Sequence, residues 1–178
     1  MTTRRDPEAR RQAIVEAAAA LITDAGVIDL THRRVAERAG VPLGATTYYF
    51  ASLDELSAAA IELLGGQMDA ELEELTDLVI ERGFSAAVLA DVLHEYLSNH
   101  EQVSADSALY FAGATNPQLR AYSLRWFDGL VARLEGYVGA EKARALAVFV
   151  DGAFVHAMLH EEPLPRAELE AAIAGLLR

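Results

Sequence analysis

Apolar residues recur at intervals of three and four along nearly the whole chain, and no segment alternates apolar and polar residues convincingly. The first such stripe consists of Ile14, Ala17, Ala18, Leu21 and Ile22. Intervals of three and four place side chains on one face of a helix, whereas a half-buried strand needs an interval of two. The pattern therefore predicts an all-α protein.

Capping residues and helix breakers place three helices in the first fifty residues. Asp6-Pro7 begins the first helix as N-cap and first-turn proline, and Gly26 ends it. Thr31 caps a short second helix that ends at Gly40. A third short helix is predicted over 43–49.

Longer helices follow. Ser52 and Glu55 have the spacing of a capping box, which marks the start of a fourth helix that continues towards Arg82. Gly65-Gly66 is expected to be a kink or weak point within it. Five further helices complete the predicted nine, over about 85–99, 104–114, 117–138, 141–160 and 166–177.

Charge is unevenly distributed, although the chain as a whole carries −12. Residues 1–50 hold seven arginines and six acidic residues, whereas residues 51–178 hold eight basic and twenty-one acidic residues. The N-terminal segment is therefore the part that phosphate does not strongly repel. Charge and helix length change together near residue 51, which predicts one domain over 1–51 and another over 52–178.

Several classes of protein are disfavoured. The chain has no cysteine, so disulfides and thiolate metal sites are excluded. The apolar run 17–22 is short for a signal peptide, and Asp151 and His156 interrupt the apolar stretch 145–159, which is too short to span a bilayer. No P-loop, dinucleotide fingerprint or nucleophile elbow is present. We expect a soluble cytoplasmic protein with no cofactor, no catalysis and no membrane partner.

The stretch 30–56 has the properties of a helix-turn-helix. Gly40 permits a tight turn, and small side chains at Ala36 and Ala39 allow two short helices to approach closely. The second helix then presents a face of hydroxyls, methyls and aromatic edges that suits base edges in a major groove, at Leu43, Gly44, Ala45, Thr47 and Tyr48. The alternative is a tight helical hairpin that packs internally and binds nothing.

Two positions beside this face suit phosphate. Amides at a helix N-terminus favour anions, so Thr31 together with Arg33 forms one candidate clamp. Ser52, which opens the next helix, forms a second candidate on the other side of the recognition helix.

The residues of this stretch resemble the tetracycline-repressor (TetR/AcrR) family of regulators. The resemblance covers about residues 10–56, and the matching positions keep order and spacing: Thr31, Arg33, Val35, Ala36, Ala39, Gly40, Val41, Gly44, Tyr48, Phe50 and Leu56. It implies a nine-helix fold with a three-helix DNA-binding domain and a helical domain for ligand binding and dimerisation. It also implies a ligand-responsive regulator, most often a repressor, that binds a pseudo-palindromic operator as a homodimer.

The resemblance assigns roles to individual residues. It implies backbone contacts from Thr31, Arg33, Tyr49 and Ser52, and base contacts from the exposed face of the helix over 43–49. Thr47 stands where the family most often has a tyrosine, and Leu53 replaces a common lysine. We therefore expect N-terminal arginines to supply part of the phosphate affinity: Arg4, Arg5, Arg10 and Arg11.

Two apolar stripes near the C-terminus are candidates for a dimer interface. They consist of Leu146, Phe149, Val150, Ala153, Phe154 and Ala157, and of Leu169, Ala172, Ile173 and Leu176. Read alone, either stripe is equally well explained as the core of its own domain. The family resemblance implies a four-helix interface built from these two helices of each subunit.

Aromatic and polar residues in the acidic half are candidates for an effector pocket, namely Tyr96, His100, Tyr110, Phe111, Tyr122, Trp126, Phe127 and His156. Together they suggest a small, mostly apolar effector with one or two polar anchors, although core packing explains each one alone. His156 and His160 lie one helical turn apart and can share a metal, which keeps a metal-sensing repressor open. A helical interaction module without DNA binding is the remaining alternative.

Overall fold

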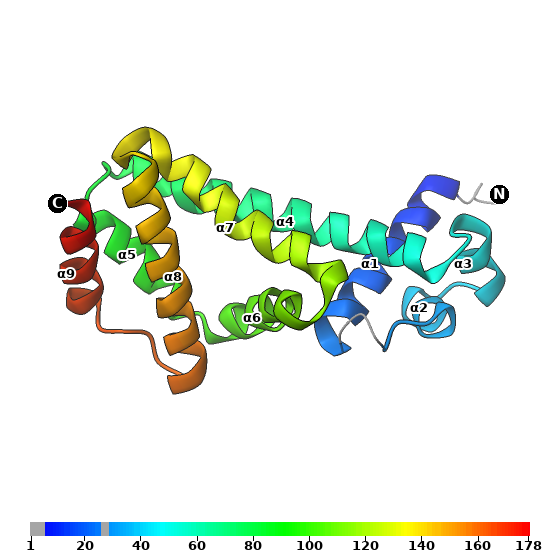
Figure 1. The fold of residues 1–178 in the computed structure, drawn as a ribbon. Helices are drawn as coiled ribbons and strands as arrows, with labels where there is room; N and C mark the ends of the chain where they lie inside the picture. Colours follow the sequence, from blue (N-terminus) through cyan, green and yellow to red (C-terminus); the bar gives the residue numbers. More distant parts are fainter. Residues whose placement is uncertain (1–5, 26–28) are drawn as a thin grey trace. The chain divides into compact units, whose positions relative to one another are not determined.

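The computed structural model describes residues 6–25 and 29–178, apart from nine side chains: those of Ala25, Glu101, Ser104, Ala105, Ser107, Ala108, Leu109, Phe111 and Thr115. The described residues form nine helices and no strand (Figure 1). The helices are α1 (Pro7–Ala25), α2 (His32–Ala39), α3 (Leu43–Tyr49), α4 (Leu53–Glu81), α5 (Ala86–Leu97), α6 (His100–Thr115), α7 (Pro117–Val138), α8 (Ala140–His160) and α9 (Arg166–Leu177). The prediction of an all-α, nine-helix chain is confirmed.

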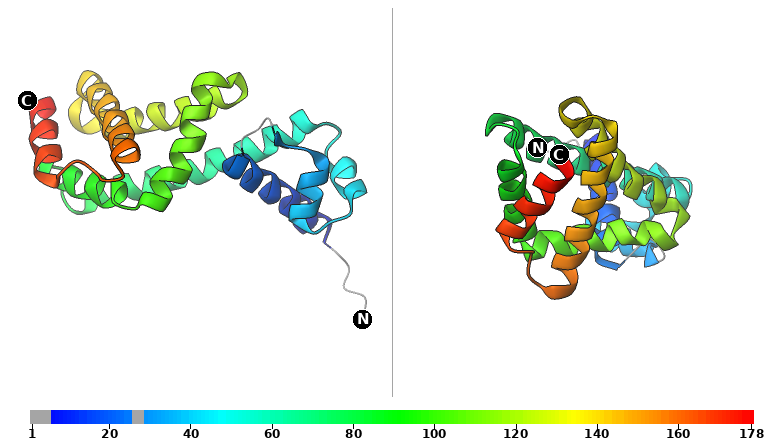
Figure 2. Two further views of the ribbon diagram at one scale, coloured as in Figure 1. Left: turned by 90° about the horizontal axis from the view of Figure 1, so that it is seen from below. Right: turned by 60° about the vertical axis from the view of Figure 1, so that its left-hand side comes forward.

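The chain forms two compact units, which divide between Gln67 and Met68 within α4. In the first unit, α2 packs against both α1 and α3. In the second, α7 packs against α6 and α8, and α9 packs against α5 and α8 (Figure 2). Each unit has its own buried core, the first including Ile14, Ile22, Val35, Phe50 and Leu56, and the second Leu119, Leu130, Leu146, Leu169 and Ile173.

The predicted caps of α2 are present. The side chain of Thr31 accepts a hydrogen bond from the backbone N–H of Arg34 at 3.2 Å. Gly40 ends the helix in the left-handed conformation (φ 64°), which glycine adopts without a Cβ clash. At the start of α1, Asp6 accepts a hydrogen bond from the Glu8 amide at 3.0 Å. Gly26, the predicted end of α1, lies outside the described residues.

The capping box of α4 is formed, except that the Glu55 carboxylate binds the amide of Ala51 and not that of the N-cap residue Ser52. Ser52 Oγ accepts from the Glu55 amide at 3.1 Å, and the Glu55 carboxylate accepts from the Ala51 amide at 2.8 Å. α4 then runs unbroken from Leu53 to Glu81, so the glycine pair Gly65-Gly66 does not interrupt it.

The predicted start of the sixth helix was wrong. α6 begins at His100 rather than at Ser104, because Asn99 accepts a hydrogen bond from the Gln102 amide at 3.3 Å and caps the helix four residues earlier. A cap at Asn99 satisfies an amide that would otherwise lack a partner.

α8 is longer than the apolar stretch identified in the sequence. Its 21 residues are long and apolar enough to cross a membrane by length and composition alone. A third of its apolar window is buried inside the protein, where Ala143, Leu146 and Phe154 belong to the core of the second unit. Burial on one side accounts for part of this apolar composition and leaves an exposed apolar face.

Candidate DNA-binding surface and ligand cavity

α2 and α3 form a tight pair in the first unit. The Val41 amide donates to the Ala36 carbonyl at 3.0 Å and closes the turn between the helices. Val35 and Ala36 are buried on α2, and Thr46 on α3 is fully buried, with its hydroxyl donating to the Leu43 carbonyl at 2.8 Å. The inner face of α3 is therefore committed to packing.

The opposite face of α3 is exposed. Tyr48 is 81% exposed and Leu43 is 51% exposed, and Gly44 and Thr47 are also exposed. Ala45 is half-buried at the edge of this face. Because α3 has no charged residue in its sequence, this face offers hydroxyl, methyl and aromatic groups without a net charge. Such groups suit base edges and thymine methyls in a major groove.

The candidate phosphate contacts lie in the same unit as this face. Thr31, Arg33 and Ser52 are exposed, while Tyr49 is half-buried and packs edge-on against Tyr48 with ring centroids 5.1 Å apart. Both capping hydroxyls accept a hydrogen bond from their helix and keep a proton to donate. These groups have the chemistry that phosphate oxygens accept.

The arginines of this unit differ in their availability. Arg34 donates to the Asp29 carbonyl at 2.7 Å, and Arg38 forms an ion pair with Asp24 at 3.0 Å. Arg33 has no such partner among the described residues and is exposed, so it remains available to a phosphate.

Two N-terminal arginines can be placed. Arg11 lies over the Phe50 ring, with its guanidinium carbon 5.1 Å from the ring centroid, and Arg10 is half-buried. A stacked guanidinium keeps its edge donors free, so Arg11 can still meet a phosphate. Arg4 and Arg5 lie outside the described residues.

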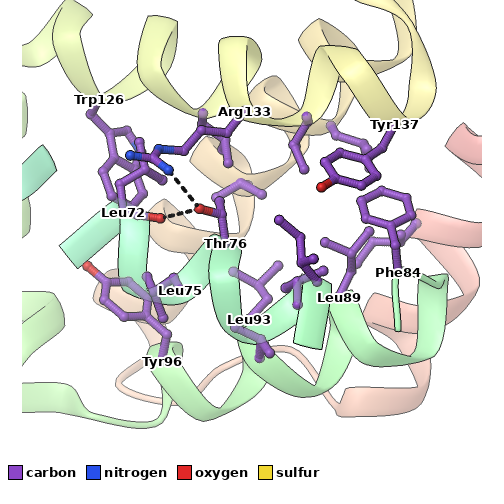
Figure 3. Close-up of a pocket in the computed structure, with 18 residues that line it drawn as sticks. Leu72, Leu75, Thr76, Phe84, Leu89, Leu93, Tyr96, Trp126, Arg133 and Tyr137 are labelled. Carbon is purple, nitrogen blue, oxygen red and sulfur yellow. Dashed lines mark hydrogen bonds between the residues drawn. The ribbon is translucent and has the colours of Figure 1, made fainter. Parts of the chain in front are cut away.

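The second unit contains an apolar cavity bounded by α4, α5, α7, α8 and α9. Its volume is about 80 Å³. Aromatic side chains stand at its two ends, Tyr96 with Trp126 at one and Phe84 with Tyr137 at the other (Figure 3). The Phe84 and Tyr137 rings stack with centroids 5.0 Å apart, and leucine, valine and isoleucine line most of the space between the ends.

Few polar groups reach this cavity, and most are already hydrogen-bonded. The Thr76 hydroxyl donates to the Leu72 carbonyl at 2.8 Å and accepts from Arg133 Nη1 at 3.4 Å (Figure 3). The Tyr96 hydroxyl donates to Asp106 at 2.6 Å.

Only some of the residues predicted for the effector pocket line the cavity. Tyr96 and Trp126 line the cavity. Five others lie outside its lining, and the side chain of Phe111 lies outside the described residues. The five outside are His100, Tyr110, Tyr122, Phe127 and His156.

Tyr110 illustrates why a predicted pocket residue lies elsewhere. Its hydroxyl donates to Asp151 on α8 at 2.9 Å, and its ring meets Phe154 edge-on. The side chain therefore joins α6 to α8. Sequence reasoning missed the contribution of α4, whose apolar positions at 72, 75, 79 and 80 follow helical spacing and line the cavity together with Thr76.

A polar bridge joins α4, α5 and α6 behind Tyr96. The Gln102 side-chain amide donates to Glu71 at 3.2 Å and to Asp106 at 3.1 Å. Burial, and then the negative charges of Asp106 and Glu74, raise the pKa of Glu71 to about 7. Glu71 is therefore protonated over a range in which a solvated glutamate is ionised.

This raised pKa predicts a pH-dependent stability. Between pH 4.5 and about 7 the folded chain holds a proton on Glu71 that the unfolded chain releases, so stability falls as pH rises across that range. Glu71→Gln removes the titration, and we expect the variant to gain stability relative to the wild type as pH rises from 5 to 8. Thermal unfolding of both proteins across this range measures the difference, and a difference that does not change with pH would contradict the assignment.

The histidines of the metal-sensing alternative do come together. The rings of His156 and His160 stack with centroids 4.2 Å apart. Within the described residues, however, no three histidine, cysteine or acidic side chains are grouped so that they could hold a metal ion. The pair therefore lacks the third protein ligand that metal sites usually have.

A shallow groove runs over α8 and α9. Its apolar floor comprises Ala140, Ala145, Val148, Phe149, Ala172 and Leu176. Six residues of the two predicted interface stripes are instead buried inside the unit, namely Leu146, Ala153, Phe154, Ala157, Leu169 and Ile173. The stripes therefore serve two purposes, because one side of each helix supplies the core and the other side faces the groove.

Known families match both parts of the chain. Residues 14–60 match the model for bacterial regulatory proteins of the tetR family, and residues 81–178 match the tetracyclin repressor-like C-terminal domain. The chain belongs to the TetR family of transcriptional regulators. It is a DNA-binding regulator and not an enzyme.

Several TetR-family regulators are similar over nearly the whole chain. The regulator PksA of Bacillus subtilis is 25% identical over 86% of this chain and 81% of its own. The regulator BetI of Rhizobium meliloti is 26% identical over 93% of this chain and 84% of its own. The structure of the multidrug binding protein EbrR complexed with proflavin is 32% identical, covers 94% of this chain and 99% of its own, and has a TM-score of 0.77. EbrR has also been solved with malachite green and with ethidium.

Membership of the TetR family bears on one alternative that the sequence left open. A helical module that has lost DNA binding is disfavoured, because the family model spans the helix-turn-helix from α1 into α4. The departures at Thr47 and Leu53 therefore stand within a DNA-binding domain.

Proposed function

We propose that this TetR-family protein is a ligand-responsive repressor that binds a pseudo-palindromic operator as a homodimer in the cytoplasm. A small, mostly apolar effector enters the cavity of the second unit and releases the DNA. The observation that carries the proposal is the exposed, uncharged face of α3, with Thr31, Arg33 and Ser52 exposed in the same unit. Tyr48 is 81% exposed and Leu43 is 51% exposed, so both are available to contact base edges.

The groove over α8 and α9 supports the homodimer. Val148 is 60% exposed within this groove, and an apolar surface of this kind is typical of an interface. Glu141 and Arg144 also line the groove, so a two-fold axis passing between them would pair opposite charges across the interface. A two-fold dimer carries two recognition helices and therefore reads two half-sites.

Val148→Glu is expected to convert the dimer to a monomer. The side chain is exposed in the single chain, so the fold tolerates the change, whereas burying a carboxylate in a largely apolar interface is costly even with Arg144 nearby. Light scattering after size exclusion measures the mass. Leu124→Glu is the matched control, because it also replaces an exposed apolar side chain with a carboxylate. Leu124 is 52% exposed and does not line the groove. A V148E protein that remains dimeric would contradict the interface.

Release of DNA by an effector is proposed to act through α4. Leu72 and Thr76 of α4 line the cavity, and the same unbroken helix begins at Leu53, next to the candidate phosphate contact Ser52. An effector that prefers one position of α4 shifts the population towards that state. The complexes of the similar protein EbrR with proflavin and malachite green support a ligand-responsive role for this chain.

A gel shift tests the proposal. The full chain is mixed with the intergenic DNA upstream of its own gene at several salt concentrations. We expect specific retardation that weakens as salt rises, since phosphate contacts release counterions. Loss of the complex on addition of zinc alone would favour the metal-sensing alternative. Absence of binding to any palindrome in this DNA would contradict the proposal.

A further inference from the structure

Among the described side chains that line the cavity, Arg133 alone carries a charge. It lies on α7, and its guanidinium reaches Thr76 on α4 across the cavity wall (Figure 3). The other lining residues are apolar or neutral. A charge at the wall of an apolar cavity decides which ligands can enter, because it repels like charge in surroundings that screen poorly.

The partners of Arg133 hold it loosely. Its guanidinium lies 3.5 Å from the Glu73 carboxylate, whose side chain is 63% exposed, and its bond to Thr76 is long at 3.4 Å. Arg125, two turns earlier on α7, shows the contrast: its guanidinium binds Asp69 through contacts of 2.6 to 3.0 Å. A pair whose carboxylate is largely exposed, such as Arg133 with Glu73, contributes little and is readily exchanged. Arg133 therefore keeps donors for another carboxylate.

The hydroxyls of Thr76 and Tyr96 are committed to other acceptors, and no carboxylate among the described residues lines the cavity to pair with a cation. The Thr76 hydroxyl donates to backbone carbonyls of its own helix, and the Tyr96 hydroxyl donates to Asp106. Asp106 and Glu71 lie outside the residues that line the cavity. A cation in the cavity would therefore meet the positive charge of Arg133 without a carboxylate in the lining to offset it.

We propose that the effector of this regulator is a small apolar or aromatic carboxylate. Its carboxylate binds the guanidinium of Arg133 in competition with Glu73, with the paired geometry that a guanidinium offers to a carboxylate. Its apolar part fills the space towards the stacked Phe84 and Tyr137. The cavity volume of about 80 Å³ limits the effector to a small molecule unless the walls move. This inference rests on the proposed role of the cavity as the effector site.

The chain supplies its own reporter for the test. Trp126 is the only tryptophan in the sequence, and it lines the cavity. Three probes of equal chain length differ only in the head group: octanoate, octanamide and octylamine. Each is titrated at pH 8 while Trp126 fluorescence is recorded. We expect octanoate to change the fluorescence with at least tenfold higher affinity than octylamine, and octanamide to lie between them.

Two variants are expected to move the octanoate affinity in opposite directions. Arg133→Gln lowers it by about tenfold or more, which is the ordinary effect of losing a charged hydrogen bond. Glu73→Gln raises it, because the competing carboxylate is gone. Arg133→Lys keeps the charge without the paired donors and falls between the wild type and R133Q. Arg120→Gln, an exposed arginine on the same helix that does not line the cavity, leaves the affinity unchanged. Thermal unfolding checks that each variant is folded.

The outcomes separate this inference from the proposed function. Equal or tighter binding of octylamine, or an octanoate affinity that R133Q leaves unchanged, would overturn the carboxylate effector and leave the operator-binding regulator standing. Failure of all three probes to change the fluorescence, while ethidium does so, would also overturn it. The operator-binding part of the proposed function has its own test, because it fails if the ligand-free chain does not retard its upstream DNA.

Discussion

Replacing Gly44 with glutamate is expected to weaken operator binding by about 100-fold or more, because like charges brought together at an interface cost several kcal/mol. Gly44 lies on the exposed face of α3, and a Cβ added there meets no atom within 4 Å. An acidic residue in the first turn of a helix is also favourable for the helix itself. The substitution therefore leaves the fold intact while it places a carboxylate against phosphates and base acceptors.

Fluorescence anisotropy with a labelled operator fragment measures this loss. Gly136→Glu is the matched control, because Gly136 is also an exposed helical glycine with open space around its Cα but lies on α7 in the second unit. The control adds the same charge to the chain and is expected to bind the operator within about threefold of the wild type. If G44E bound as tightly as G136E, α3 would not be the helix that meets DNA.

Gly113→Ala is expected to destabilise the second unit by about 3 kcal/mol, at the upper end of the usual cost of overpacking. A Cβ at this position would lie 2.0 Å from Ser123 Oγ and 3.0 Å from the Leu119 carbonyl oxygen. α6 and α7 pack closely here, and Ser123 Oγ is held in place because it donates to the Tyr110 carbonyl at 2.7 Å. The backbone oxygen cannot rotate away, so the helices must separate.

Urea unfolding of G113A and of Gly136→Ala distinguishes this clash from the general effect of adding a methyl group. The control adds its methyl group to open space in a helix and is expected to gain a few tenths of a kcal/mol up to about 1 kcal/mol. The double variant G113A/S123A removes the oxygen at 2.0 Å but leaves the Leu119 carbonyl, so it should recover only part of the stability. A G113A protein as stable as the wild type would show that α6 and α7 do not pack as described.

The DNA-binding unit could be predicted from sequence because its determinants are local. The Thr31 cap and the left-handed Gly40 are set by residues within a few positions of each other, and the structure places both as expected. The exposed face of α3 follows from the burial of Thr46 and Phe50 at the neighbouring positions. Local consistency of this kind survives whatever the remainder of the chain does.

The cavity could be predicted only in part, because it depends on packing between distant segments. Tyr96 and Trp126 were found as aromatic residues, but Tyr110 has the same pattern and is instead bound to Asp151 on α8. Arg133 carried no signal in the sequence, since a lone arginine on a long helix is usually solvated. Its place in the cavity lining follows only from the packing of α4 against α7, which brings it beside Thr76.

The two predicted interface stripes also show that spacing alone does not tell core from surface. The spacing of apolar residues on α8 identified the helix but could not separate its two apolar faces. Leu146 proved to be core, whereas Val148, two residues later, is 60% exposed and lines the groove. Helix periodicity reports which residues share a face, and packing decides what covers that face.

DNase I footprinting of the intergenic DNA upstream of the gene tests the central claim most directly. The wild-type chain is expected to protect one pseudo-palindrome whose half-sites are separated by about one helical turn of roughly 10 bp, or by a multiple of it. The G44E protein should give no protection at the same concentration, while G136E protects the same bases. Protection by wild type and G44E alike, or the absence of any protected site, would contradict the account of α3 as the reader of an operator.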